Sequence, residues 1–129
     1  LITHEIPGLK LRGTFHYDEG YYYFRNVGNR VLFGGGRNLD FSAEKTTEHA
    51  LTSVVQEKLD ELLSTMILPG VEFKVDMRWA GTMGVGKTKS PIVKKIDEHV
   101  FCAVRMGGMG IALGSLTGEE VAELVGKEI

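Results

Sequence analysis

A stripe of apolar residues at Ala50–Met66 most constrains what this chain folds into. Its apolar side chains recur at the i, i+3, i+4, i+7 spacing that places them on one face of an α-helix. Ser42 is a suitable N-terminal cap for this helix, with Glu44 in the first turn, and Pro69-Gly70 stops it. The pattern predicts a long amphipathic helix that begins at Ser42 and must bury one face against other elements.

Segments before and after this helix carry the alternation and the aromatic and β-branched residues that are typical of strands. Val71–Trp79 alternates apolar and charged residues most strictly, which predicts one buried face and a Trp79 side chain in the core. Gly28-Asn29 and Asp97-Glu98-His99 predict tight turns between neighbouring strands. The predicted strands are Leu9–Tyr17, Tyr21–Val27, Arg30–Phe33, Val71–Trp79, Pro91–Ile96 and Val100–Met106.

A second, apolar helix is predicted from Ile111 to about Val125, after the glycine cluster Gly107–Gly110. Thr117 and Glu120 have the spacing of a capping box that would restart this helix within its length. The element order is then β-β-β-α-β-β-β-α. Strands joined by short turns favour an α+β fold, with an antiparallel or mixed sheet and two helices packed on it. Residues 1–129 are expected to form a single domain.

Composition and charge exclude several classes of protein. The formal net charge of -2 gives no electrostatic attraction towards nucleic acid, and no apolar run reaches the length of a membrane span. The lone cysteine, Cys102, is expected to be a buried thiol, and one cysteine forms neither an intrachain disulfide nor a metal cluster. The four histidines lack metal-ligand spacing, so we expect no metal site. These features and the lack of a visible signal peptide fit a cytoplasmic location.

The sequence Gly81–Thr88 matches the nucleotide-binding pattern G-x-x-x-x-G-K-S/T in full. A phosphate-binding loop of this kind leads into a helix whose N-terminus faces the phosphates. Here Pro91 follows almost at once, and Ile92, Val93 and Ile96 are typical of a strand. The later apolar run ends in Arg105 rather than in an acidic Mg²⁺ ligand. A nucleotide-binding protein is therefore the least favoured of the functions considered.

The same region resembles a different family. Trp79-Ala80-Gly81, Pro91-Ile92-Val93, Gly110-Ile111 and Thr117-Gly118 occur in this order along the chain. They resemble the C-terminal part of the FAD-dependent D-amino acid oxidase and glycine oxidase family, which carries W-A-G, a P-x-I segment, a glycine-rich turn ending in G-I and a helix containing T-G. The spacing matches over roughly Gly20–Val125.

The resemblance implies that this chain is a fragment of a larger flavoprotein, which its start at Leu1 also favours. Family members bind FAD with an N-terminal GxGxxG unit that this chain lacks, so the cofactor is expected in the full-length parent and not in the fragment alone. The expected reaction is hydride transfer from an amine, amino acid or related small substrate to flavin N5. The expected partners are a small-molecule substrate and the FAD-binding domain of the same polypeptide, with neither nucleic acid nor membrane.

The resemblance also carries site residues onto this chain. The glycine-rich turn would abut the flavin ring, where a helix N-terminus stabilises negative charge on the reduced flavin. A plain tight turn remains the alternative. Tyr22 matches a family tyrosine near the substrate, with cross-strand packing as its alternative. The cofactor-binding residues are expected to be Met106, Gly107, Gly108, Met109, Gly110 and Ile111.

One departure from the family pattern concerns the substrate. The family arginine that pairs with the substrate carboxylate falls at Met83, which forms no charge-assisted pair. Arg105, just before the glycine-rich turn, is the preferred replacement. Arg25, Arg37 and Arg78 are alternatives, as are Lys87 and Lys89. No nucleophile–base pair is evident, so no catalytic residue is assigned. A stand-alone small-ligand or protein-interaction module remains the main alternative function.

Overall fold

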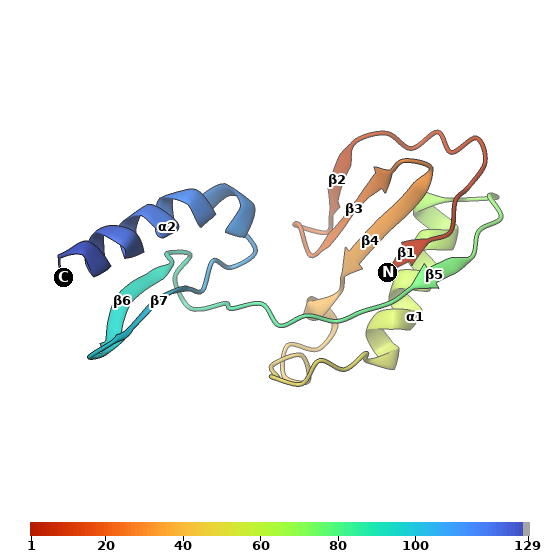
Figure 1. Ribbon diagram of the computed structural model, residues 1–129. Coiled ribbons are helices and arrows are strands. Elements are labelled where there is room, and N and C mark those ends of the chain that lie inside the picture. Colours follow the sequence, from red (N-terminus) through yellow and green to blue (C-terminus); the bar gives the residue numbers. More distant parts are fainter. Residues whose placement is uncertain (128–129) are drawn as a thin grey trace. The chain divides into compact units, whose positions relative to one another are not determined.

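The computed structural model describes residues 1–127, and the chain divides into two compact units, Leu1–Gly81 and the residues from Thr82 onward (Figure 1). The first unit is a five-stranded sheet with helix α1. The second is the hairpin β6–β7 with helix α2. All described strand pairs are antiparallel. The predicted α+β class, with two helices and antiparallel sheets, is confirmed.

The sheet of the first unit has the strand order β2-β3-β4-β1-β5. The meander β2–β3–β4 follows the prediction, except that its first strand starts at Thr14, because Gly13 has a φ of 115° that interrupts an extended chain. The two-residue β1 was not predicted, since it is too short to show alternation. The strands are β1 Ile2–Thr3, β2 Thr14–Tyr17, β3 Tyr22–Val27, β4 Arg30–Gly35 and β5 Val75–Met77.

The core of the first unit lies between one face of this sheet and α1 (Ser53–Leu62) with the π-helical turn η2 (Leu63–Ile67). Phe33 and Leu63 are 1% and 0% exposed, and burial of one such side chain contributes about 1.5–3 kcal/mol. On the opposite face, the side chains of β3 are exposed and those of β4 are half-buried, and no helix of the first unit packs there. The buried side chains of the core include Tyr22, Val31, Phe33, Val55, Leu59, Leu62 and Leu63.

The predicted helix start at Ser42 is wrong, since α1 begins at Ser53. The Asp40 carboxylate accepts hydrogen bonds from the backbone N–H groups of Ser42 and Ala43, at 3.0 and 2.9 Å. Aspartate side chains that bond nearby backbone in this way compete with helix formation. The short 3₁₀ turn η1 (Arg37–Leu39) precedes this turn. Taking Ser42 as the N-terminal cap thus lengthened the predicted helix by about three turns at its start.

The predicted strand Val71–Trp79 is also shorter in the structure, because only Val75–Met77 pairs with β1. β1 offers two residues, and the register shifts between them, so a longer edge strand has no partner. Met77 and Trp79 are 57% and 51% exposed. Phe73 and Val75, on the same predicted face, are half-buried and pack against the core, so the buried face is shorter than expected. The expected core position of Trp79 is wrong.

In the second unit, α2 (Gly110–Gly126) packs on the hairpin of β6 (Ile92–Asp97) and β7 (Val100–Val104). The helix runs without a break, so the predicted capping box is wrong. The Thr117 hydroxyl instead donates to the carbonyl oxygen of Leu113, 2.9 Å away, as mid-helix threonines do. Cys102 on β7 is half-buried. None of the described helices is long and apolar enough to span a bilayer.

Gly114 offers a direct test of this continuous helix. A Cβ added there would meet nothing within 4 Å, and its backbone is helical. Gly114→Ala is expected to stabilise the second unit by about 0.5–1 kcal/mol, because alanine loses less backbone entropy in a helix. The measurement is urea unfolding followed by circular dichroism. The reverse change at exposed Ala112, Ala112→Gly, is the matched control and should cost a similar amount. A loss of stability with Gly114→Ala would contradict the continuous helix.

Candidate functional site

The junction between β7 and α2 contains two consecutive left-handed residues, and we call the segment Met106–Ile111 the glycine turn. Gly107 and Gly108 have φ values of 57° and 87°, conformations that favour glycine. α2 then starts with Met109 as its N-terminal cap residue and no side-chain capping hydrogen bond. The first N–H groups of the helix therefore point out of the turn without a side-chain acceptor, and they carry the positive end of the helix dipole.

An open pocket lies between the glycine turn and the start of the segment Thr82–Ser90, which we call the glycine loop. Its volume is about 410 Å³, and no charged side chain lines it. The N–H of Gly107 donates to the carbonyl oxygen of Gly84 at 3.0 Å, which joins the two walls. The pocket is lined by Thr82, Met83, Gly84, Met106, Gly107, Gly108, Gly110 and Ile111.

The pocket brings Met83 together with five of the six residues that the sequence nominated in the glycine turn. The remaining one, Met109, caps α2 and is 54% exposed. Met83 comes close to the turn, since a Cβ on Gly108 would lie 3.2 Å from the Met83 sulfur. The surface offered to a ligand is therefore glycine backbone, the thioethers of Met83 and Met106, and the side chains of Thr82 and Ile111.

Arg105 does not line this pocket. Its guanidinium donates to the carbonyl oxygen of Ser90 through Nη2 and Nε, at 2.9 and 3.3 Å, and to the Thr88 hydroxyl through Nη2 at 3.0 Å. The backbone φ of Arg105 is 63°, a conformation that is uncommon outside glycine. Most donors of this guanidinium are thus engaged within the second unit.

The nucleotide-binding pattern Gly81–Thr88 does not form a phosphate-binding loop. No helix follows it, because β6 starts at Ile92. The Thr88 hydroxyl, which would bind Mg²⁺ in such a loop, accepts a hydrogen bond from Arg105. The sequence argument against a phosphate site at this position agrees with the structure.

Tyr22 lies in the core of the first unit, with an exposed fraction of 2% and its ring near those of Tyr17 and Phe33. Burial raises the pKa of its phenol. The next residue, Tyr23, lies on the open face of the sheet. Its hydroxyl covers Gly34, where a Cβ would lie 2.7 Å from that oxygen. The alternation of a strand places neighbours on opposite faces, but it does not tell which face a helix covers.

The other candidate arginines differ in the contacts that their side chains make. Arg37 lies 5.1 Å from the ring centre of Tyr21 and also stacks on Phe41. Arg78 donates to Gln56 and Asp60. Arg25 is exposed on the same face as Tyr23, and within residues 1–127 its side chain makes no hydrogen bond, ion pair or ring contact. The sequence named Arg25 only as an alternative, because a sequence does not show which arginine side chains form hydrogen bonds or ion pairs in the fold.

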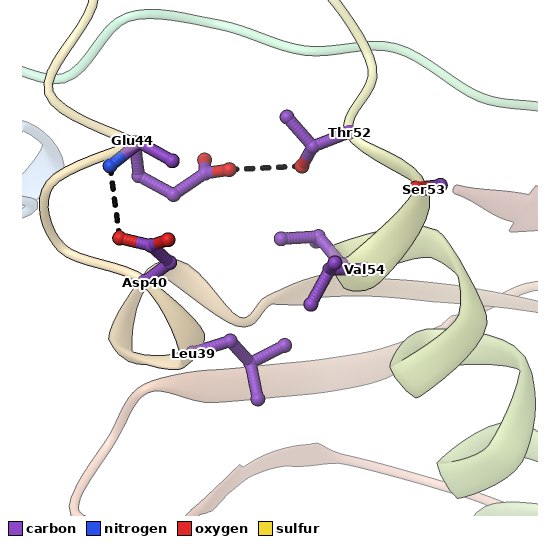
Figure 2. A pocket seen from close by; sticks show the side chains of 8 residues that line it. Leu39, Asp40, Glu44, Thr52, Ser53 and Val54 are labelled. Carbon is purple, nitrogen blue, oxygen red and sulfur yellow. Dashed lines mark hydrogen bonds between the residues drawn. The ribbon is translucent and has the colours of Figure 1, made fainter.

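A second pocket, of about 350 Å³, lies in the first unit where the loop after η1 meets the start of α1 (Figure 2). Figure 2 shows the Glu44 carboxylate, which accepts a hydrogen bond of 2.8 Å from the Thr52 hydroxyl. It also shows the Asp40 carboxylate, which accepts a hydrogen bond from the backbone N–H of Ala43 in the same turn. Both carboxylates thus anchor the loop before the helix. Among residues 1–127, no group of three histidine, cysteine, aspartate or glutamate side chains is placed to hold a metal ion.

Comparison with known proteins gives the family. The family model described as DAO, FAD dependent oxidoreductase, matches residues 2–124. The chain belongs to this family of FAD-dependent oxidoreductases. It is also 30% identical over 105 residues to a protein of Haemophilus influenzae named "Probable oxidoreductase OrdL", a match that covers 81% of this chain and 21% of the relative. This DAO-family chain thus spans about a fifth of that relative's length. No solved structure matches the chain.

Proposed function

We propose that this DAO-family chain forms the substrate side of an enzyme that uses FAD to oxidise an amine, an amino acid or a related small molecule. The observation that carries the proposal is the pocket at the glycine turn, where an uncapped helix N-terminus faces an uncharged wall. Bound FAD would supply the electron-accepting ring for a hydride from the substrate. The residues of the pocket fit a flat ring that develops negative charge at one edge.

The chain's own contribution is positioning and electrostatics. Gly107 and Gly108 let a planar group approach the backbone closely, since neither carries a Cβ. The N–H groups of Gly110 and Ile111, at the start of α2, would donate towards the negative edge. Met83 and Met106 would contact the ring through their thioethers and exclude water.

We propose that Arg25, on the exposed face of β3 in the first unit, is a candidate for binding an anionic group of a small molecule. Within residues 1–127 the Arg25 side chain makes no hydrogen bond, ion pair or ring contact, and the Tyr23 hydroxyl lies over Gly34. Because Met83 stands at the position of the family arginine, a cation elsewhere is needed for an anionic substrate. Tyr22, which the family resemblance nominated, and Arg105, the preferred cation, remain candidates for substrate contact.

We propose that the FAD-binding part of the same polypeptide is the partner of this chain, with no role for nucleic acid or membrane. This rests on the relative, of which the chain covers 21%. The chain alone is expected to retain no FAD.

The test is purification of the whole protein that the gene encodes. We expect a yellow protein with a visible flavin absorption band that bleaches when an amine or amino acid is added without oxygen. The chain of residues 1–129, purified in the same way, serves as the control and should be colourless. A colourless whole protein that also fails to bind added FAD would contradict the proposal and would favour a small-ligand or protein-interaction module.

A further inference from the structure

We propose that Arg105 is a positioning residue that sets the separation between the two walls of the pocket, by clamping the glycine loop (Thr82–Ser90) beside the glycine turn (Met106–Ile111). The inference rests on the function proposed above, which supplies the occupant of the pocket. It assigns to Arg105 a role in holding the loop that carries Met83.

The side chain of Arg105 holds the far end of the glycine loop. Nη2 and Nε both donate to the Ser90 carbonyl oxygen, and Nη2 also donates to the Thr88 hydroxyl. A planar guanidinium supplies these donors in one fixed fork, whereas the ammonium of lysine is a single compact group. The contact therefore depends on the shape of arginine as well as on its charge.

Two glycines of the loop make room for Arg105. A Cβ on Gly86 would lie 2.7 Å from Cδ and 2.9 Å from Nη1 of Arg105, and a Cβ on Gly84 would lie 3.1 Å from its Cα. Real Cβ atoms essentially never come as close as the first two distances. The glycines that give the sequence its resemblance to a phosphate-binding motif thus accommodate an arginine of the same chain.

The backbone of Arg105 holds the other wall. Its left-handed conformation turns the chain two residues before Gly107, whose N–H donates to the Gly84 carbonyl oxygen. A left-handed conformation is unfavourable for a residue with a side chain, so it needs compensating interactions. The hydrogen bonds to Thr88 and Ser90 are the compensating interactions that the structure provides.

Removal of the clamp should loosen the pocket without removing any group that lines it. Arg105→Gly keeps the left-handed backbone and deletes the side chain. In the whole flavoprotein we expect KM to rise about tenfold or more, the loss expected when charged hydrogen bonds are removed, with a smaller change in kcat. The visible spectrum of the bound flavin should shift. Arg105→Lys should not restore the wild-type KM, because lysine lacks the fork.

Gly86→Ala supplies an independent test, since its new Cβ would displace the Arg105 side chain. We expect it to raise KM as much as Arg105→Gly does, and we expect the double variant to be no worse than either single one. Gly126→Ala is the matched control, because a Cβ there meets nothing within 4 Å. An unchanged KM and spectrum in Arg105→Gly, or additive losses in the double variant, would overturn the proposal.

Hydrogen exchange separates this inference from the proposed function. In the chain itself, Arg105→Gly should speed amide exchange at Gly107, whose N–H donates to the Gly84 carbonyl oxygen, and leave β6 and β7 unchanged. A colourless whole protein would refute the flavoenzyme, and the exchange measurement would then decide whether the clamp exists. Unchanged exchange at Gly107 would overturn the clamp even if the protein is a flavoenzyme.

Discussion

Gly35→Ala is expected to cost the first unit about 3–5 kcal/mol of stability, which combines backbone strain with overpacking. Gly35 ends β4 with a φ of 126°, a conformation that residues with a side chain rarely adopt. It also lies against β3 so closely that a Cβ would be 2.0 Å from the Tyr21 carbonyl oxygen and 2.7 Å from the Tyr22 Cα. Both contacts are with backbone, so relief requires the two central strands to separate.

A loss of this size is a large part of the stability of a small domain, which is about 5–15 kcal/mol in all. Gly28→Ala is the matched control. Gly28 also has a positive φ, 59°, but a Cβ there meets nothing within 4 Å. Its cost should be about 1–2 kcal/mol, the price of left-handed backbone alone. Urea unfolding of the two variants measures the difference, and equal costs would show that close approach to β3 is unimportant.

The elements that the sequence predicted correctly are those with local causes. The hairpins β3–β4 and β6–β7 follow from strand periodicity and short turns, and Gly28 and Asn29 supply the turn chemistry that the first of them needs. α1 and α2 follow from apolar periodicity. In each case the residues that determine the structure lie within a few positions of one another.

The errors arise where distant or competing interactions decide. At Asp40, a side chain bonded to nearby backbone replaced the first turns of the predicted helix. In Val71–Trp79 the alternation was sound, but a strand also needs a partner, and β1 provides two residues. The exposure of Trp79 followed from that missing partner. Periodicity describes which side chains share a face, but it does not show whether anything covers the face.

Only the locally encoded part of the candidate site could be predicted from the sequence. Glycine clusters indicate turns wherever they occur, so the glycine turn could be located before the fold was known. Met83 lies beside this turn because the N–H of Gly107 donates to the carbonyl oxygen of Gly84, more than twenty positions away in the sequence. The engagement of Arg105 and the freedom of Arg25 are likewise properties of the folded chain.

Gly108→Val is expected to remove flavin from the whole protein almost completely. Gly108 has a φ of 87°, and valine, branched at Cβ, is poorly suited to left-handed backbone. Its Cβ would lie 3.2 Å from the Met83 sulfur, and Gly108 lines the pocket, so the valine side chain would narrow it. A strained turn and an obstructed pocket together should weaken flavin binding about a hundredfold, since each tenfold loss of affinity corresponds to about 1.4 kcal/mol.

Gly8→Val is the control for strain alone, because Gly8 has a similar φ of 71° and open space around it, in the first unit. It should lower stability while the protein keeps its flavin. The ratio of flavin absorbance to protein, before and after dialysis, measures both variants. Stoichiometric flavin in Gly108→Val would mean that the glycine turn does not contact the cofactor, and the helix N-terminus of α2 would then be no more than a turn into a packed helix.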